Sequence, residues 1–167
     1  MWAETDEGLV NLMKASTDAN LEGRVMRYPR MDKEILSKYS KGIIASSGCP
    51  SGIIQTRLLL GQFDEALRAA GELQDIFGRD NFYIEFMDHG LNIERQVTDG
   101  LLDIAKKLNA PLLATNDSHY VRAEDAGAQD AMLCINSGST LDEPGRFKFD
   151  GTGYYLKSAE EMRELFK

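Results

Sequence analysis

Asp117 and His119 stand two positions apart in the run Asn116-Asp117-Ser118-His119-Tyr120, directly after an apolar segment. In an extended backbone, residues i and i+2 point to the same side, so both side chains can reach one point. A carboxylate and an imidazole placed in this way are natural ligands for Zn²⁺, Mn²⁺ or Fe. The alternative is that Asp117 caps the following turn while His119 packs on Tyr120.

Cys49 lies in a second unusual stretch, the turn Ser47-Gly48-Cys49-Pro50-Ser51-Gly52. A thiolate in such a turn would bind a metal or act as a nucleophile, and a Cys–His–Asp triad is one reading of the three residues. The alternative is a small buried apolar residue. Cys134 fits that alternative well, because it lies within a helical stripe, whereas the shaped turn around Cys49 favours a site.

Glu85, Asp88 and His89 form a third polar cluster. Glu85 interrupts an apolar strand, which is unfavourable unless its charge is paired, so it is expected to orient a ligand or hold an arginine. For His89, which precedes Gly90, capping of the next helix is favoured over a role in a site.

The elements that position these residues follow from hydrophobic periodicity. Three short apolar runs are predicted strands, and the loop-like stretch Ser137–Gly153 follows them. The strands are 42–46, 82–86 and 111–115. The predicted helices are 6–20, 32–39, 63–77, 91–108, 124–135, with Ala128, Ala131, Met132 and Ile135 inward, and 158–166, opened by a capping box at Ser158.

Short apolar strands alternating with helices indicate an α/β fold with a parallel sheet or barrel. In such folds, chemistry gathers where strands end and loops begin. The three polar stretches follow the three predicted strands in turn. We therefore expect their side chains to meet at one edge of the sheet.

Composition limits the possible functions. The chain has 167 residues, 43% hydrophobic and 28% charged, and a formal net charge of −8. This acidic balance opposes independent binding to DNA or RNA, which depends on lysine and arginine. Two cysteines make no disulfide framework, and no signal peptide or membrane-spanning stretch is present, so a cytoplasmic location is expected.

Several longer runs resemble the PHP (polymerase and histidinol phosphatase) domain of bacterial replicative DNA polymerase III α subunits. Their residues are most similar to those of actinobacterial versions. The resemblance covers nearly the whole chain in order. It is carried by the runs Tyr28–Leu36, Gly42–Gly52, Phe82–Gly90, Leu113–Tyr120, Asp130–Gly138 and Tyr154–Met162.

The resemblance implies a distorted α/β barrel that carries up to three metal ions and that, in some lineages, is a 3′–5′ proofreading exonuclease. It assigns Cys49, Asp117 and His119 as metal ligands, with Zn or Mn, and possibly Mg, as the metal. Glu85, Asp88, His89 and Asn116 would form the surroundings of the site. The ligand atoms are expected to converge within roughly 4–5 Å, given metal bonds of about 2.0–2.3 Å.

The chain departs from the family pattern at its start, because the His-x-His strand is absent and His89 and His119 are the only histidines. The expectation is a partial PHP domain, the later strands and helices of the barrel, with 137–167 leading toward the polymerase core. Such a chain holds at most one partial metal site and is inactive alone. It meets DNA only within the full polymerase, together with other replisome subunits.

Two alternatives stay open. The first is a non-catalytic scaffold that supports the polymerase, and the second is a stand-alone PHP phosphoesterase. A partial barrel also implies that the strand at Ile43-Ile44-Ala45 has an open edge, that the helix face at Leu9, Leu12 and Met13 is partly exposed, and that the chain is prone to aggregation.

Overall fold

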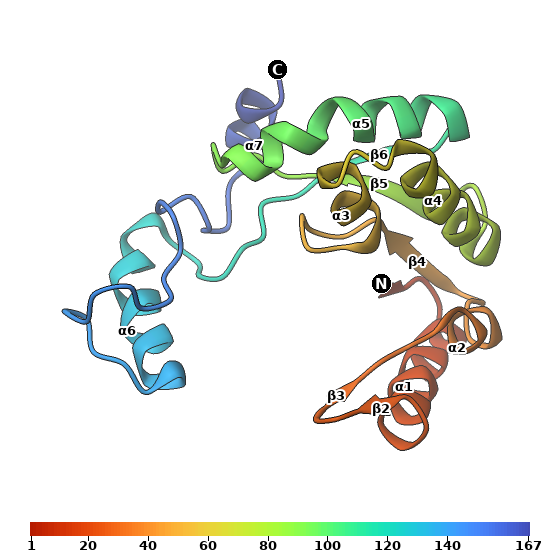
Figure 1. Ribbon diagram of the computed structural model, residues 1–167, viewed down its shortest axis with the longest axis horizontal. Helices are drawn as coiled ribbons and strands as arrows, with labels where there is room; N and C mark the ends of the chain where they lie inside the picture. Colours follow the sequence, from red (N-terminus) through yellow and green to blue (C-terminus); the bar gives the residue numbers. More distant parts are fainter. The chain divides into compact units, whose positions relative to one another are not determined.

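The computed structural model describes all residues, Met1–Lys167 (Figure 1). It divides into two compact units. Unit 1 comprises Met1–Glu85 and Val97–Leu113, and unit 2 comprises Phe86–Gln96 and Ala114–Lys167. None of the helices combines the length and apolar character needed to cross a membrane.

The helices match the sequence prediction closely, with one addition, the short helix α3. Their bounds are α1 Asp6–Leu21, α2 Lys33–Lys38, α3 Ile53–Leu59, α4 Phe63–Phe77, α5 Asn92–Leu108, a 3₁₀ turn η1 Ala123–Asp125, α6 Ala126–Ser137 and α7 Ala159–Leu165. The capping box predicted at the start of the last helix is present, because Ser158 and Glu161 each accept from the other's backbone N–H.

A four-stranded sheet runs in the order β1 (Trp2–Ala3), β4 (Ile43–Ser46), β5 (Phe82–Phe86) and β6 (Leu112–Ala114). The central strands β4 and β5 are parallel, with Ala45 opposite Phe82. This confirms the predicted α/β class with a parallel sheet.

The core of unit 1 lies where alternate strand residues meet helical stripes. Ile43 and Ala45 of β4 are buried, as are Phe82 and Ile84 of β5, because alternate residues of a strand share a face. The buried helical residues recur at three- and four-residue spacing, as expected for amphipathic helices. They are Ala66, Ala69, Ala70 and Phe77 of α4, and Val97, Leu101, Ile104 and Ala105 of α5.

Helix α1 packs closely on the turn that precedes β4. A Cβ atom added to Gly8 would lie 1.8 Å from the carbonyl oxygen of Gly42, so only glycine fits there. Thr5 caps the helix by accepting from the backbone N–H of Gly8 at 3.1 Å. The other side of α1 confirms the predicted exposure, since Leu9 and Met13 lie open to solvent.

Two sequence predictions are wrong in this structure. The strand at Ile43 and Ile44 does not have an open edge, because the chain start folds back as β1 and pairs antiparallel with it, Trp2 opposite Ile44 and Ala3 opposite Ile43. A two-residue partner was too short for periodicity to indicate.

The second error concerns the face of α6. Met132 and Ile135, predicted to point inward, are exposed, whereas Cys134 is buried. The helix is turned because the loop after it packs on the side of Asp130 and Cys134, where Arg146 meets Asp130. Weak amphipathicity left the inward face of this helix to tertiary contacts.

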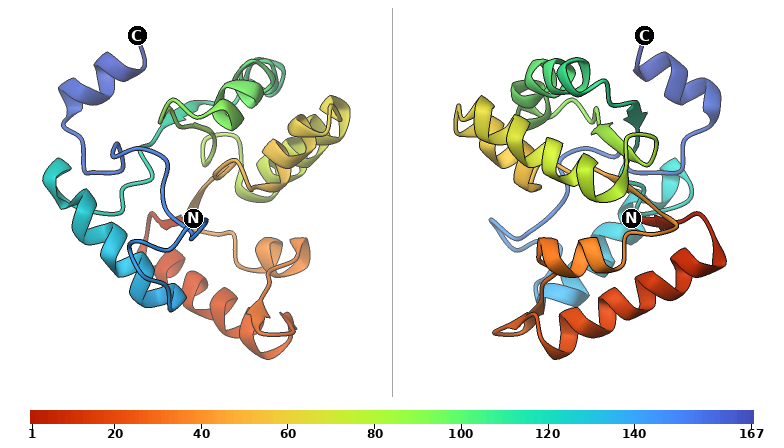
Figure 2. Two further views of the ribbon diagram at one scale, coloured as in Figure 1. Left: turned by 60° about the vertical axis from the view of Figure 1, so that its left-hand side comes forward. Right: turned by 90° about the vertical axis from the view of Figure 1, so that its right-hand side faces the viewer.

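A small antiparallel hairpin, β2 (Arg24–Val25) with β3 (Tyr28–Pro29), was not predicted. It follows α1, and both views of Figure 2 show it at the C-terminal end of that helix.

The exposed face of α1 generates a prediction on self-association. Leu9→Lys with Met13→Lys should raise the monomer fraction of the chain in size-exclusion chromatography, because an exposed apolar patch is replaced by charge. The free energy of unfolding should change by no more than about 0.5 kcal/mol, as is usual for surface changes.

Ala15→Lys is the matched control, because Ala15 is buried on the same helix. It should unfold or strongly destabilise the chain through burial of an unpaired charge. An unchanged elution profile for the Leu9 and Met13 variant would show that this face does not drive association.

Candidate functional site

The segment Asn116–Tyr120, which carries two predicted ligands, is held in unit 2 by the later segment Gly153–Lys157. The backbone N–H of His119 donates to the carbonyl of Tyr154 at 2.8 Å, and the N–H of Leu156 donates to the carbonyl of Tyr120 at 3.1 Å. These bonds form a parallel bridge between Tyr120 and Tyr155. The position of Asp117 and His119 therefore depends on a chain segment more than thirty residues later.

The buried side chain of Asn116 strengthens this connection. Its amide nitrogen donates to the carbonyls of Gly153 at 2.8 Å and Tyr155 at 2.7 Å. Its amide oxygen accepts from the Lys157 ammonium at 2.9 Å, and partial burial lowers the pKa of that ammonium. Asn116 thus acts as a clamp: both of its amide protons are donated, and its oxygen accepts one bond.

Asp117 adopts a backbone conformation suited to a turn, with φ of +43°. This left-handed region is unfavourable for most residues but is tolerated by aspartate, and such conformations recur at functional sites. The turn brings the carbonyl of Asp117 to 2.6 Å from Nδ1 of His119, and a carboxylate oxygen of Asp117 lies 3.9 Å from the same nitrogen.

Because a carbonyl oxygen only accepts, Nδ1 of His119 is the donor in this contact. A histidine oriented by a backbone carbonyl through one nitrogen is the arrangement that metal-binding histidines use. The side chains of His119 and Asp117 are 37% and 44% exposed, so solvent reaches both.

Aromatic rings form one wall beside His119. Its ring meets the Phe149 ring edge-on with centroids 4.6 Å apart, and Phe149 stacks on Tyr154 at 4.7 Å. Tyr154 also stacks on the ring of His89, with ring centroids 4.2 Å apart. Burial raises the pKa of the Tyr154 phenol.

His89 has a different role from the helix cap that we predicted. Its side chain is 3% exposed, and Nδ1 lies 2.7 Å from a carboxylate oxygen of Glu94, itself 6% exposed. Nε2 lies 3.0 Å from the carbonyl oxygen of Asn116. Both ring nitrogens therefore lie beside oxygen acceptors, one on the Glu94 side chain and one on the Asn116 backbone.

The cap itself is made by Glu94. Its second carboxylate oxygen accepts from the backbone N–H groups of His89 at 2.7 Å and Leu91 at 3.2 Å. Asp88 makes a local turn, because its carboxylate accepts from the N–H of Gly90 at 2.9 Å. The polar stretch after β5 is therefore mainly structural.

Cys49 lies in unit 1, exposed in the turn after β4. The turn is closed by a bond from the N–H of Gly52 to the carbonyl of Cys49 at 2.7 Å, and the buried Gln55 side chain donates to the carbonyl of Gly48 at 2.7 Å. An exposed thiol on a fixed turn agrees with a role as a ligand and not with the buried alternative, which Cys134 follows.

Glu85 is buried near the end of β5, also in unit 1. The hydroxyl of Ser46 on the adjacent strand donates to its carboxylate, and its own N–H donates to the hydroxyl of Ser47 at 2.9 Å. Glu85 therefore ties together the ends of β4 and β5, which explains how a carboxylate is accommodated inside an apolar strand.

The three predicted ligands are thus divided between the units. Asp117 and His119 lie together in unit 2, whereas Cys49 lies in unit 1. Neither unit by itself brings three or more His, Cys, Asp or Glu side chains together as a metal site. Convergence of all three ligands stays a prediction.

Sequence reasoning missed several residues that surround the site. Glu94, Phe149, Tyr154 and Lys157 all contribute to it. Glu94 and Lys157 had the appearance of ordinary helix and surface charges. The one sequence signal that could have found them is the recurrence of aromatic residues in 147–155, which indicates a segment that packs against the rest of the protein.

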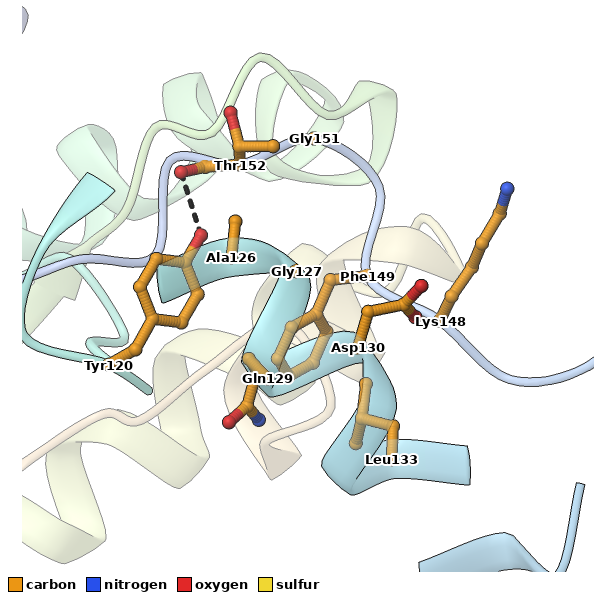
Figure 3. A pocket seen from close by; sticks show the side chains of 10 residues that line it. All are labelled: Tyr120, Ala126, Gly127, Gln129, Asp130, Leu133, Lys148, Phe149, Gly151 and Thr152. Carbon is orange, nitrogen blue, oxygen red and sulfur yellow. Dashed lines mark hydrogen bonds between the residues drawn. The ribbon is translucent and has the colours of Figure 1, made fainter. Parts of the chain in front are cut away.

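A pocket of about 340 Å³, with Phe149 in its lining, opens between α6 and the segment 148–152 (Figure 3). Tyr120 closes one end by donating its hydroxyl to the carbonyl of Thr152 at 2.7 Å. Asp130 lies on its wall and is held by Arg146 through two parallel bonds of 2.6 Å. This ion pair fixes the loop 139–147 on α6.

The buried His89–Glu94 pair predicts a stability difference between the two histidines. His89→Ala should lower the free energy of unfolding by about 1–3 kcal/mol, because it removes a buried hydrogen-bond partner of the Glu94 carboxylate and of the Asn116 carbonyl. The amide protons of His119 and Leu156 should then exchange faster with solvent. His119→Ala, on an exposed side chain, should change stability by only about 0.5 kcal/mol. Equal effects of the two variants would contradict this assignment.

The Asp130–Arg146 pair predicts a pH dependence. Hydrogen bonding from Arg146 holds the pKa of Asp130 below its usual value. Its contribution to stability is therefore fully present above the unfolded-state pKa of about 3.9 and is lost as pH falls through the lower folded-state pKa. The melting-temperature gap between the chain and Asp130→Asn should stay constant from pH 7 to about 5 and close below about pH 4. A gap unchanged at pH 2.5 would count against the pair.

Comparison with known proteins identifies the family of this chain. The model of the PHP domain matches residues 1–89, more than half of the chain. The chain is 58% identical over 166 residues to the DNA polymerase III subunit alpha of Saccharopolyspora erythraea, and 54% identical to that of Mycobacterium tuberculosis. The corresponding subunit of Treponema pallidum is 41% identical over 164 residues.

These matches cover 98–99% of the chain but only 14% of the length of each relative. They confirm the resemblance drawn from the sequence motifs, including the greater likeness to the actinobacterial subunits. The chain belongs to the PHP domain family.

Proposed function

We propose that the chain is part of the PHP domain of a bacterial replicative DNA polymerase III α subunit, where it contributes ligands to a divalent metal site. The observation that carries the proposal is identity of 54–58% to such subunits over 99% of the chain. That likeness continues through unit 2, beyond the residues matched by the PHP model. Its partners are the rest of the subunit and, through it, DNA and other replisome proteins.

Cys49, Asp117 and His119 would hold the metal. Zn²⁺ or Mn²⁺ fits a thiolate, a carboxylate and an imidazole, and Mg²⁺ suits only the carboxylate. A bound ion of this kind would activate water and neutralise the charge of a phosphodiester. In the proposal, this chemistry serves 3′–5′ exonuclease activity in the complete domain.

The residues of unit 2 each contribute a defined part. The carbonyl of Asp117 orients the His119 ring through Nδ1, so Nε2 would be the nitrogen that binds the metal. The Asn116 clamp holds both residues against the segment Gly153–Lys157. His89, held by Glu94, supports the clamp because its Nε2 contacts the carbonyl of Asn116.

Three ligands suffice for one four-coordinate ion with water as the fourth ligand, but not for a bridged cluster. The isolated chain is therefore expected to bind at most one ion and to lack exonuclease activity.

A non-catalytic scaffold is the second candidate. It is favoured by the number of polar groups near the site that are already used in structural hydrogen bonds, among them Asn116, His89 and Glu94. A stand-alone phosphoesterase receives no such support, because the similarity to polymerase subunits extends over nearly the whole chain.

Metal titration separates the two candidates. We expect the chain to bind about one equivalent of Zn²⁺ in competition with a chromophoric chelator. Asp117→Asn, His119→Gln and Cys49→Ser should each weaken binding at least about tenfold, since each removes a ligand. Cys134→Ser is the matched thiol control and should bind Zn²⁺ as tightly as the unmodified chain does.

Equal Zn²⁺ affinity of the Cys49→Ser and Cys134→Ser variants would exclude Cys49 as a ligand. Absence of Zn²⁺ binding by the unmodified chain would favour the non-catalytic scaffold. A 3′-labelled single strand incubated with the chain and Mn²⁺ should remain intact. Degradation that Asp117→Asn abolishes would show that one partial site is sufficient for catalysis.

A further inference from the structure

The β2–β3 hairpin concentrates positive charge in an acidic chain. Residues 23–31 contain Arg24, Arg27 and Arg30 and no acidic residue, whereas the whole chain has a net charge of −8. All three arginines are exposed. No carboxylate of unit 1 pairs with them, although Arg68 of the same unit binds Glu65 and Glu72. The hairpin therefore offers three uncompensated guanidinium groups.

The hairpin also exposes apolar and aromatic surface. Tyr28 is 53% exposed and Met26, at the turn with φ of +58°, is 91% exposed. The hairpin lies at the C-terminal end of α1, and its turn extends past the helix in the right-hand view of Figure 2. A small hairpin that places a tyrosine and arginines in solvent buries little of its own surface, which is typical of an interaction site.

Two of the arginines, Arg27 in the turn and Arg30 directly after β3, lie close to Tyr28 along the hairpin. Val25 and Tyr28 are partners across the hairpin, so their side chains share a face. Arg30, two residues beyond Tyr28, shares that face, and its N–H still pairs with the carbonyl of Gly23 at 3.1 Å. The guanidinium of Arg27 lies 5.2 Å from the centre of the Tyr28 ring. Arg24 is on the opposite face, with Pro29 as its partner.

We propose that this face of the hairpin, Arg27, Tyr28 and Arg30, binds single-stranded nucleic acid. The two guanidinium groups would contact successive phosphates, and an unstacked base would stack on Tyr28. An aromatic ring between cations is how proteins bind single strands without sequence preference. An acidic peptide would use the arginines but would leave the exposed ring without a role.

The geometry of the hairpin is independent of the metal residues. Only the choice of nucleic acid over another polyanion rests on the proposed function. Because the rest of the chain is acidic, binding should be weak, with a dissociation constant of about 10–100 µM at 50 mM salt. Contact with two phosphates predicts a slope of about −1.4 when the logarithm of the binding constant is plotted against that of salt concentration.

The test is fluorescence anisotropy of labelled (dT)15 with the monomeric 167-residue chain in EDTA. Arg27→Gln with Arg30→Gln should weaken binding at least about tenfold and bring the salt slope near zero. Arg79→Gln with Arg95→Gln is the matched control, because it removes the same charge from two other exposed arginines. The control should keep most of the affinity and the full slope. Tyr28→Leu should weaken binding about tenfold while keeping the slope, because it removes stacking alone.

Three results would overturn the proposal. They are the absence of saturable binding, equal losses in the hairpin and control variants, and displacement of (dT)15 by poly-glutamate as effective as that by unlabelled (dT)15. Far-UV circular dichroism of every variant establishes that its fold is kept. Since EDTA removes metal, failure of this test leaves the Zn²⁺ titration unaffected, and the two proposals fail separately.

Discussion

The buried amide of Asn116 is the interaction on which unit 2 depends. Three of its hydrogen bonds join the end of β6 to Gly153, Tyr155 and Lys157, across about forty residues of sequence. Buried polar groups are costly unless they are satisfied, so a fully bonded asparagine specifies one arrangement of these two segments. The loop between them, with α6, is consequently tethered at both ends, and the aromatic stack of Phe149 and Tyr154 is brought beside His119.

The same constraint explains why Asp117 and His119 can be both exposed and ordered. Their neighbours on either side, Asn116 and Tyr120, carry the side-chain hydrogen bonds to the segment Thr152–Lys157. The side chains of Asp117 and His119 make no hydrogen bond to that segment, and the His119 ring bonds only to the carbonyl of Asp117. Asp117 accepts an unfavourable φ because the backbone around it is fixed from both sides. Within this five-residue segment, the structural hydrogen bonds and the candidate ligands are therefore carried by different side chains.

Charge is distributed unevenly over the molecule. The acidic residues occur throughout the helices, while unpaired arginines gather on the hairpin after α1. In unit 2, by contrast, Arg146 is paired with Asp130, and the buried His89 ring lies beside the Glu94 carboxylate. Net charge describes how a chain behaves as a whole, whereas recognition depends on where uncompensated charges lie.

Local patterns in the sequence determined most of the secondary structure, the α/β class and the residue types of the candidate ligands. Helix periodicity placed α4 at its observed bounds, since Phe63, Ala66, Ala70 and Phe77 form one stripe. Strands β4, β5 and β6 were evident as apolar runs, and motifs alone singled out Cys49, Asp117 and His119. Such signals are visible in sequence because they arise from neighbours one to four residues apart.

Only the tertiary structure decided which residues make the contacts that stabilise the fold. The pairing of β1 with β4, the inward face of α6, the partnership of His89 with Glu94 and Asn116, and the hairpin that gathers the arginines all depend on contacts that periodicity does not encode. The physical reason is that a buried polar or weakly amphipathic residue takes its role from the groups that surround it. Those groups are selected by the packing of the whole unit.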